Sequence, residues 1–443
     1  MRDRFVAVAQ GLVLSFVCAF GLQAAETPIV ISVNTDHPDS IYSAGQQVRF
    51  TVTARRGDQP LRNAEVTIMI APALPSGKKM PKNLDQNGSA TVDGGTLDSP
   101  GVLSCIVHLH GKETNGNDKV IAAGQIGAGF DLEKTTPSMP PPDDFDAFWT
   151  QQKARLAAVP MNPVLTPVES RERKIEAYDV KLDCVPPRPA TAYFARPRGA
   201  TPKSLPIILL VHAAGVEASS LAAATGAASK YNALAMDINA HGIPNGKTGS
   251  FYSDLAKGEL DHYQHLGRED RETCYFLGML LRDLRGLDFL TSQPEWNGRT
   301  LIVRGGSQGG GQAIALAGLD PRVTLISACI PALCDHTGCV IGRKCGWPGL
   351  VPCVNGKPDP KILQVARYFD CVNFAPKVKA EALFCVGFCD GTCPPTSVYA
   401  AYNNIRGKKK IYNEPTKLHQ VMPGFVAITD DAVAAHIAAM KGQ

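Results

Sequence analysis

The sequence predicts two architectures in one chain, a small all-β sandwich followed by a larger α/β unit whose sheet is flanked by helices. Short β-branched runs separated by Gly, Asp, Asn and Pro turns fill residues 27–133, a pattern typical of a sandwich. From residue 143 onward, apolar strand-like runs alternate with helical patterns such as 273–290. A glycine-rich motif at 305–311 lies between one such strand and a helix.

The two architectures meet at a proline-rich stretch. Residues 137–142 are Pro-Ser-Met-Pro-Pro-Pro, a composition that favours a stiff linker. We therefore assign residues 26–136 to the sandwich domain and residues 143–443 to the α/β domain. The sequence leaves the role of the sandwich open, because a polysaccharide-binding module, a rigid spacer and an oligomer interface all fit its pattern.

The first 25 residues predict a secretory signal peptide. Met1-Arg2-Asp3-Arg4 precedes an apolar run over 5–22, and small residues follow, so cleavage is expected after Ala24 or Ala25. This interpretation predicts a secreted or periplasmic protein without a stable membrane anchor. The alternative is an uncleaved anchor, since the apolar run is long for a signal.

The motif Gly-Gly-Ser307-Gln308-Gly follows the apolar run 300–303 and precedes a helical segment at 312–317. In this context GxSxG is typical of the nucleophile turn of an α/β-hydrolase, which exposes the serine hydroxyl at the edge of the sheet. The amide of Gln308 opens the helix and can face a developing oxyanion. The alternative interpretation is a glycine-rich turn with an incidental serine.

The order of residues in such hydrolases is serine, then an acid, then histidine. Two histidines lie downstream of Ser307, and we expect His419 to be the base because it follows a strand, whereas His436 lies in an alanine-rich helix. Asp390 ends the apolar run 382–388, where a carboxylate can orient an imidazole. Its rivals lie in ordinary turns or lack such a strand: Asp320, Asp359 and Asp370.

Several stretches occur in a distinctive order: PDDFDAFW at 142–149, GGSQGGG at 305–311, LDPRV at 319–323, PALCD at 331–335, YFDCVN at 368–373, DGTCPP at 390–395 and AAYN at 400–403. Together they resemble the acetyl xylan esterase and cephalosporin C deacetylase family, carbohydrate esterase family 7. The resemblance implies an α/β-hydrolase esterase with its triad at Ser307, Asp390 and His419, the residues that chain order also selects. It implies a hexameric ring as well, although the added sandwich leaves the oligomeric state open.

The chain departs from this family at three places. The family has His-Gly-Tyr where this sequence has His212-Ala213-Ala214, so the amide of Ala214 can still serve the oxyanion while the tyrosine ring is missing. The family's Arg-Gly-Gln is replaced in a loop that contains His241. His241 is a candidate substrate contact, but we favour a loop histidine bonded to the backbone. Gln420 replaces the family's glutamate after the catalytic histidine.

Twelve cysteines remain beyond the signal, which suggests disulfides in an exported protein. We expect at least one disulfide among Cys339, Cys345 and Cys353, in a Gly- and Pro-rich loop that holds Trp347 near the acyl pocket as a candidate substrate contact. A zinc cluster of these thiols with Cys334-Asp335-His336 is disfavoured because no CxxC pair is present, so we predict neither a metal nor a cofactor.

These observations predict a secreted serine esterase that removes acetyl groups from acetylated carbohydrates, such as xylan or xylo-oligosaccharides, through an acyl-enzyme. The partner is therefore an acetylated oligosaccharide or another small acetyl ester. A net charge of +4 and the lack of a long basic run disfavour nucleic acid. Two alternatives stay open, another α/β-hydrolase such as a peptidase or a dienelactone-type hydrolase, and a non-catalytic carbohydrate-binding protein.

Overall fold

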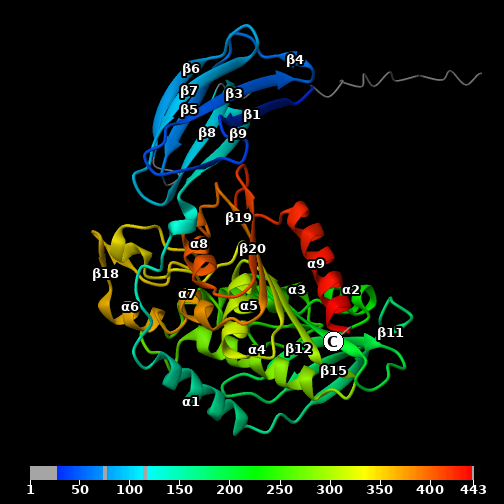
Figure 1. Cartoon of the computed structure of the whole chain (residues 1–443). Helices are drawn as coiled ribbons and strands as arrows, with labels where there is room; N and C mark the ends of the chain where they lie inside the picture. The colour runs from blue at the N-terminus through cyan, green and yellow to red at the C-terminus, as the bar shows by residue number, and fades with distance from the viewer. Residues whose placement is uncertain (1–26, 73–76, 113–116, 442–443) are drawn as a thin grey trace, which may run out of the picture.

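The computed structural model describes residues 27–72, 77–112 and 117–441. The predicted signal peptide lies outside these residues. Within them, no helix is long and apolar enough to cross a bilayer. Figure 1 shows the two parts of the chain, with the N-terminal sheets stacked above the larger α/β part.

The N-terminal part consists of two sheets packed face to face, as the sequence predicts. One sheet has the order β1-β3-β4 with β7 also on β3, and the other has the order β2-β9-β8-β5-β6. Alternating apolar side chains from both sheets form a separate core that includes Phe50, Ile68, Val107 and Phe130. The strands are β1 Ile29–Thr35, β2 Ile41–Tyr42, β3 Val48–Arg56, β4 Gln59–Pro60, β5 Glu65–Ala71, β6 Lys78–Asn83, β7 Ser89–Gly95, β8 Gly101–Lys112 and β9 Asp118–Phe130.

The larger part is built on a nine-stranded sheet of order β10-β11-β12-β14-β13-β15-β16-β19-β20. The first four strands in this order, β10, β11, β12 and β14, pair antiparallel. The remaining strands, β13, β15, β16, β19 and β20, pair parallel with one another, and β13 also pairs parallel with β14. The inner strands are mostly apolar, as expected for a sheet covered by helices on both faces, with Asp237, Arg304 and Ser327 as polar exceptions. The strands are β10 Val164–Val168, β11 Ile175–Leu182, β12 Ala190–Pro197, β13 Leu205–Val211, β14 Leu234–Ile238, β15 Trp296–Gly306, β16 Leu325–Cys329, β19 Glu381–Gly387 and β20 Lys409–Glu414, with β17 Cys353–Val354 and β18 Lys357–Pro358 as a small separate hairpin.

Helices cover the two faces of this sheet unequally (Figure 1). One apolar cluster joins α2 and α9 to one face, and the main core joins α1, α4, α5 and α8 to the other. This arrangement confirms the predicted α/β-hydrolase sheet with flanking helices. The helices are α1 Phe145–Ala157, α2 Leu221–Tyr231, α3 Gly249–Lys257, α4 Tyr275–Ser292, α5 Gln308–Leu319, α6 Pro360–Ala366, α7 Cys371–Phe374, α8 Pro395–Asn404 and α9 Pro423–Lys441, with short 3₁₀ turns at Leu132–Lys134, Tyr263–His265, Gly338–Ile341 and Ala375–Lys377.

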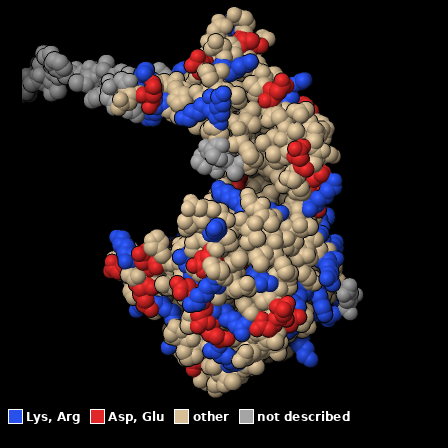
Figure 2. Space-filling view, turned by 90° about the vertical axis from the view of Figure 1, so that its left-hand side faces the viewer, with Lys and Arg blue, Asp and Glu red and all other residues tan. Residues whose placement is uncertain are grey.

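The connection between the two parts is pinned to the α/β part along its length. The amide of Ser138 donates to Asp335 Oδ1 at 2.9 Å, and Arg343 donates to the carbonyl of Thr136 at 2.8 Å. Farther along, Arg367 donates to the carbonyl of Pro140 at 3.0 Å. The predicted stiff linker is therefore a packed segment. Figure 2 shows a deep recess between the two parts, with acidic and basic side chains interspersed on that face.

The loop after β16 is ordered by a buried carboxylate. The side chain of Asp370 is fully buried and accepts the amides of Asp335 at 2.8 Å, His336 at 2.6 Å and Val372 at 3.1 Å. Burial and the neighbouring charge of Asp335 raise the pKa of Asp370, and the three amide hydrogen bonds oppose this rise. Asp335 in turn forms an ion pair with Arg343 at 2.6 Å.

The cysteines of this loop do not form the disulfide that the sequence suggests. All twelve cysteines among the described residues are free thiols. The amide of Cys339 donates to Cys345 Sγ at 3.3 Å, and Cys345 Sγ donates to the carbonyl of His336 at 3.3 Å. The loop is instead held by the Asp370 and Asp335 contacts, which need no covalent bond.

His336 offers a test of how this loop tolerates acid. Both ring nitrogens are buried and have no hydrogen-bond partner among the described residues, and burial lowers the pKa of His336 to about 3. The unfolded chain takes up a proton near pH 6.5, so this histidine contributes stability above that pH and loses it as the pH falls toward 3.

We therefore expect His336→Met to flatten the acid side of the stability profile. Between pH 7.5 and pH 5.0, wild-type protein should lose up to about 2 kcal/mol more free energy of unfolding than the variant. Urea unfolding at both pH values measures this difference. Equal losses in the two proteins would show that His336 can be protonated in the folded state.

Candidate active site

Ser307 lies in a strained turn between β15 and α5. Its backbone has φ 54° and ψ −119°, a conformation that costs a residue with a side chain on the order of 1–3 kcal/mol. Two glycines make the turn sterically feasible. A Cβ on Gly305 would lie 2.4 Å from the carbonyl of Gly309, and a Cβ on Gly309 would lie 2.4 Å from the carbonyl of Val211. The hydroxyl of Ser307 is thereby presented at the carboxyl edge of the parallel strands.

The structure brings the three predicted catalytic residues together. His419 Nε2 lies 2.9 Å from Ser307 Oγ, and His419 Nδ1 lies 2.8 Å from Asp390 Oδ2. The Asp390 side chain has no exposed surface, and its second oxygen accepts the amides of Thr392 and Cys393 at 2.8 Å each. Asp390 therefore enters the group as a fully bonded carboxylate with a fixed direction, which holds the imidazole in one orientation.

The loop after β13 lies against the first turn of α5. The side chain of Gln312 donates to the carbonyl of His212 at 2.8 Å, and His212 Nε2 lies 2.5 Å from Asp237 Oδ1. Burial alone would lower the pKa of His212, but the bond to Asp237 outweighs burial and raises it. Ala214 follows in this loop, and Gln308 is the first residue of α5, whose amide has no partner within the helix. The amide of Gln308 is therefore adjacent to Ser307, and the loop that carries Ala214 packs against α5.

Tyr263 joins these two amide-bearing segments, and the sequence analysis missed it. Its hydroxyl accepts the amide of Gly215 at 3.3 Å and donates to Gln308 Oε1 at 2.8 Å. The ring is 6 % exposed, and burial raises the pKa of Tyr263 to about 12, so the hydroxyl keeps its proton. Tyr263 lies in a 3₁₀ turn between α3 and α4, where no sequence period marks it.

His241 is a structural histidine in this site. Its Nε2 lies 2.7 Å from the carbonyl of Gly215, and its Nδ1 lies 2.9 Å from the hydroxyl of Tyr275. Burial lowers the pKa of His241 to about 4, so the ring is neutral. Since protein groups occupy both nitrogens, His241 does not offer one to a substrate; of the two interpretations, the backbone-bonded loop histidine fits.

Trp347 is held beside this network. Its amide donates to the carbonyl of Thr392 at 2.8 Å, and its carbonyl accepts the amide of Leu333 at 3.0 Å. The centre of its ring lies 6.4 Å from that of Tyr263. The half-buried indole thus lies between the segment that follows Asp390 and the tyrosine that contacts Gln308.

Three potential metal donors, on Asp390, Cys393 and His419, lie within 4.8 Å of one another. The arrangement does not fit a metal site well. Both oxygens of Asp390 already accept hydrogen bonds, and burial raises the pKa of Cys393 well above its usual value, which disfavours the thiolate that a metal requires. The cluster is better explained as the hydrogen-bonded surroundings of Ser307.

Comparison with known proteins identifies the family. Residues 130–434 match the model of the acetyl xylan esterase family. An acetyl esterase of Xylanibacter ruminicola is 28 % identical over 391 residues, which cover 87 % of this chain and 85 % of that protein. The solved acetyl xylan esterase of Paenibacillus sp. R4 is 26 % identical, with a TM-score of 0.58, and covers 69 % of this chain and 98 % of its own.

A second solved structure supports the fold. Acetyl xylan esterase 1 of Thermoanaerobacterium sp. JW/SL YS485 is 24 % identical, with a TM-score of 0.55, and covers 69 % of this chain and 97 % of its own. Both solved relatives thus match over nearly their whole length while leaving about a third of this chain unmatched. Because the family model spans well over half of the sequence, the chain belongs to the acetyl xylan esterase family and is a carboxylic ester hydrolase.

Proposed function

We propose that the protein is an exported serine esterase that removes acetyl groups from acetylated carbohydrates, xylan or xylo-oligosaccharides among them. The observation that carries this proposal is the continuous hydrogen-bonded chain from Ser307 Oγ through His419 to Asp390, at 2.9 and 2.8 Å. Such a chain activates a hydroxyl that is a poor nucleophile on its own. Export rests on the apolar run at 5–22 and the small residues after it.

In the proposed mechanism, His419 takes the proton of Ser307 as the hydroxyl attacks the acetyl carbonyl. Asp390 keeps the imidazole in the required tautomer and stabilises its cation. The amides of Gln308 and Ala214 stabilise the oxyanion of the tetrahedral intermediate. The sugar leaves with a proton from His419, and water then hydrolyses the acetyl-enzyme by the same steps. Trp347 is proposed to border the acyl site.

The triad is tested by alanine substitution. We expect Ser307→Ala and His419→Ala each to lower kcat on a small soluble acetyl ester by about 10³-fold or more, because either change leaves no activated nucleophile. His436→Ala is the matched control, since it removes the other downstream histidine, which lies in α9 and is bonded to Thr324. It should keep wild-type kcat. Near wild-type turnover in the Ser307 or His419 variant would refute the assignment.

The oxyanion proposal is tested at Tyr263. Removing its hydroxyl in Tyr263→Phe frees the amide of Gly215 and the side chain of Gln308, so we expect kcat to fall by about tenfold while KM changes little. Tyr252→Phe is the control, because this buried tyrosine also makes two hydrogen bonds, to Lys247 and Pro244, away from Ser307. Equal effects of the two substitutions would mean that Tyr263 stabilises the fold only.

The substrate class is tested with a panel of acetylated xylo-oligosaccharides, other acetylated sugars and unmodified peptides. We expect acetate release from the acetylated sugars and no peptide cleavage, both measured by chromatography. A serine-directed phosphonate should abolish the release, which separates an esterase from a non-catalytic binding protein. Cleavage of peptides, or acetate release that survives the phosphonate, would favour the alternatives.

A further inference from the structure

The N-terminal sandwich contacts the α/β part at the loop that carries His419. The amide of Gly127 in β9 donates to the carbonyl of Pro415 at 2.8 Å. Two residues earlier in β9, Gln125 Nε2 donates to the carbonyl of Thr416 at 3.0 Å. These carbonyls lie four and three residues before His419. The loop therefore satisfies part of its own backbone with donors from the sandwich.

Strand β9 also packs closely against the segment that leads to Asp390. The backbone of β9 comes so close to Phe388 that a Cβ on Gly127 would lie 2.5 Å from the Cβ of Phe388. Phe388 is 1 % exposed, and Val102 of β8 belongs to the same apolar core. Asp390 follows Phe388 by two residues. The segment that leads to Asp390 thus packs directly against the backbone of β9, at a distance that only a glycine at position 127 permits.

The two catalytic loops are bonded to each other at this point. The amide of Cys389 donates to the carbonyl of Lys417 at 3.0 Å, and the amide of Phe388 donates to that of Glu414 at 3.1 Å. The carbonyl of Pro415 also accepts from Cys389 Sγ at 3.4 Å. Because the carbonyl of Pro415 accepts from both Gly127 of β9 and Cys389, a displacement of β9 would move both loops together.

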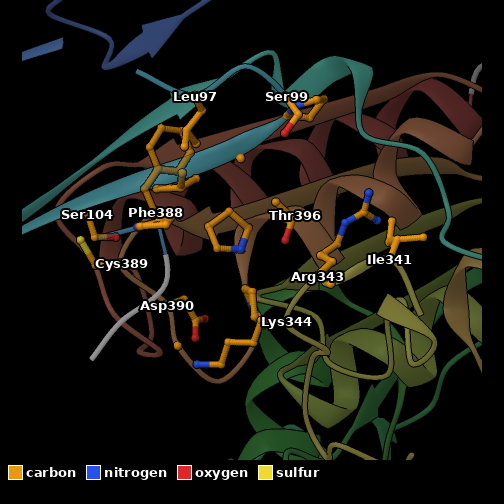
Figure 3. A pocket seen from close by; sticks show the side chains of 18 residues that line it. Leu97, Ser99, Ser104, Ile341, Arg343, Lys344, Phe388, Cys389, Asp390 and Thr396 are labelled. Atoms are coloured by element: carbon orange, nitrogen blue, oxygen red, sulfur yellow. The ribbon is translucent and has the colours of Figure 1, made fainter. Parts of the chain in front are cut away.

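A cavity of about 520 Å³ also lies between the two parts, lined by Leu97 and Ser104 from the sandwich and by Phe388, Cys389 and Asp390 from the α/β part. Figure 3 shows the side chains that line it. Asp390 lines this cavity, whereas Gly127 and Gln125 of β9 do not. The contacts of β9 with the two loops therefore lie outside the cavity.

We propose that the sandwich is a positioning part of the active site, in which Gly127 and Gln125 hold the loops that present His419 and Asp390. The inference rests on the proposed triad. It gives the sandwich a role besides the binding, spacing and oligomer functions that its sequence leaves open. The physical reason is the steep dependence of catalysis on geometry, since a displacement of about 1 Å can cost on the order of 10²-fold in rate.

The test compares two glycines of β9 in the full chain. Gly127→Ala places a Cβ against Phe388, whereas Gly124→Ala places one 2.6 Å from the carbonyl of Ile31, within the sandwich. Both should lower the melting temperature. Only Gly127→Ala should lower kcat on a small acetyl ester, by tenfold or more, with KM within twofold. The rate at which a fluorophosphonate labels Ser307 should fall by the same factor, because labelling reports nucleophile activation without a sugar.

A milder variant covers the case in which Gly127→Ala does not fold. Gln125→Met keeps the side-chain length and removes the donor to Thr416, so kcat and the labelling rate should fall about threefold to tenfold together. The inference is overturned if folded Gln125→Met and Gly127→Ala both match Gly124→Ala in kcat and labelling. His419→Ala, measured alongside, distinguishes the proposed triad from the proposed role of the sandwich. Full activity of His419→Ala would refute the triad itself. Loss of activity in His419→Ala together with unaffected β9 variants would refute only the role of the sandwich.

Discussion

The backbone of Ser307 is the constraint on which the rest of this structure depends. A serine at φ 54° and ψ −119° does not hold that conformation unless its neighbours fix it. The amide of Ser307 donates to the carbonyl of Cys329, and its carbonyl accepts the amide of Ala332, both at 2.9 Å. The end of β16 and the segment after it therefore clamp the turn from one side, while Val211 closes it from the other. The turn at Ser307 can be held in this conformation only if the surrounding sheet is rigid.

The sheet supplies this rigidity at its carboxyl edge, but the residues around Ser307 come from loops. Loops have no ladder of their own, so their backbone groups need partners from elsewhere. Asp370 supplies acceptors for the segment after β16, Tyr263 joins the loop after β13 to Gln308, and Asp390 binds two amides of its own turn. The polar groups that order the site are thus nearly all buried, where an unpaired partner would be costly.

The parts that follow a local rule could be predicted from the sequence. The strand–glycine–serine–helix pattern selected Ser307 as the candidate nucleophile, and chain order with strand ends selected Asp390 and His419 as its partners. The structure places the three within hydrogen-bonding distance. The sandwich followed from period-two strands between turns. Tyr263 could not be found in this way because its importance comes from two partners distant in sequence. The expected disulfide failed for a related reason, since composition gives the number of cysteines but not the polar contacts that already order their loop.

The boundary between the two parts illustrates the same limit. The change in sequence pattern separates the sandwich from the α/β part at the proline-rich stretch 137–142, and each part has a core of its own. Yet Val102 and Leu132 lie in the core of the α/β part, and two carbonyls before His419 are satisfied by β9. The loop that carries His419 is short and has no core of its own. An element that supplies hydrogen-bond donors to its backbone therefore also determines where the imidazole lies. Sequence patterns divide the chain into parts that have their own cores. The contacts between loops determine which of these parts contribute to one site.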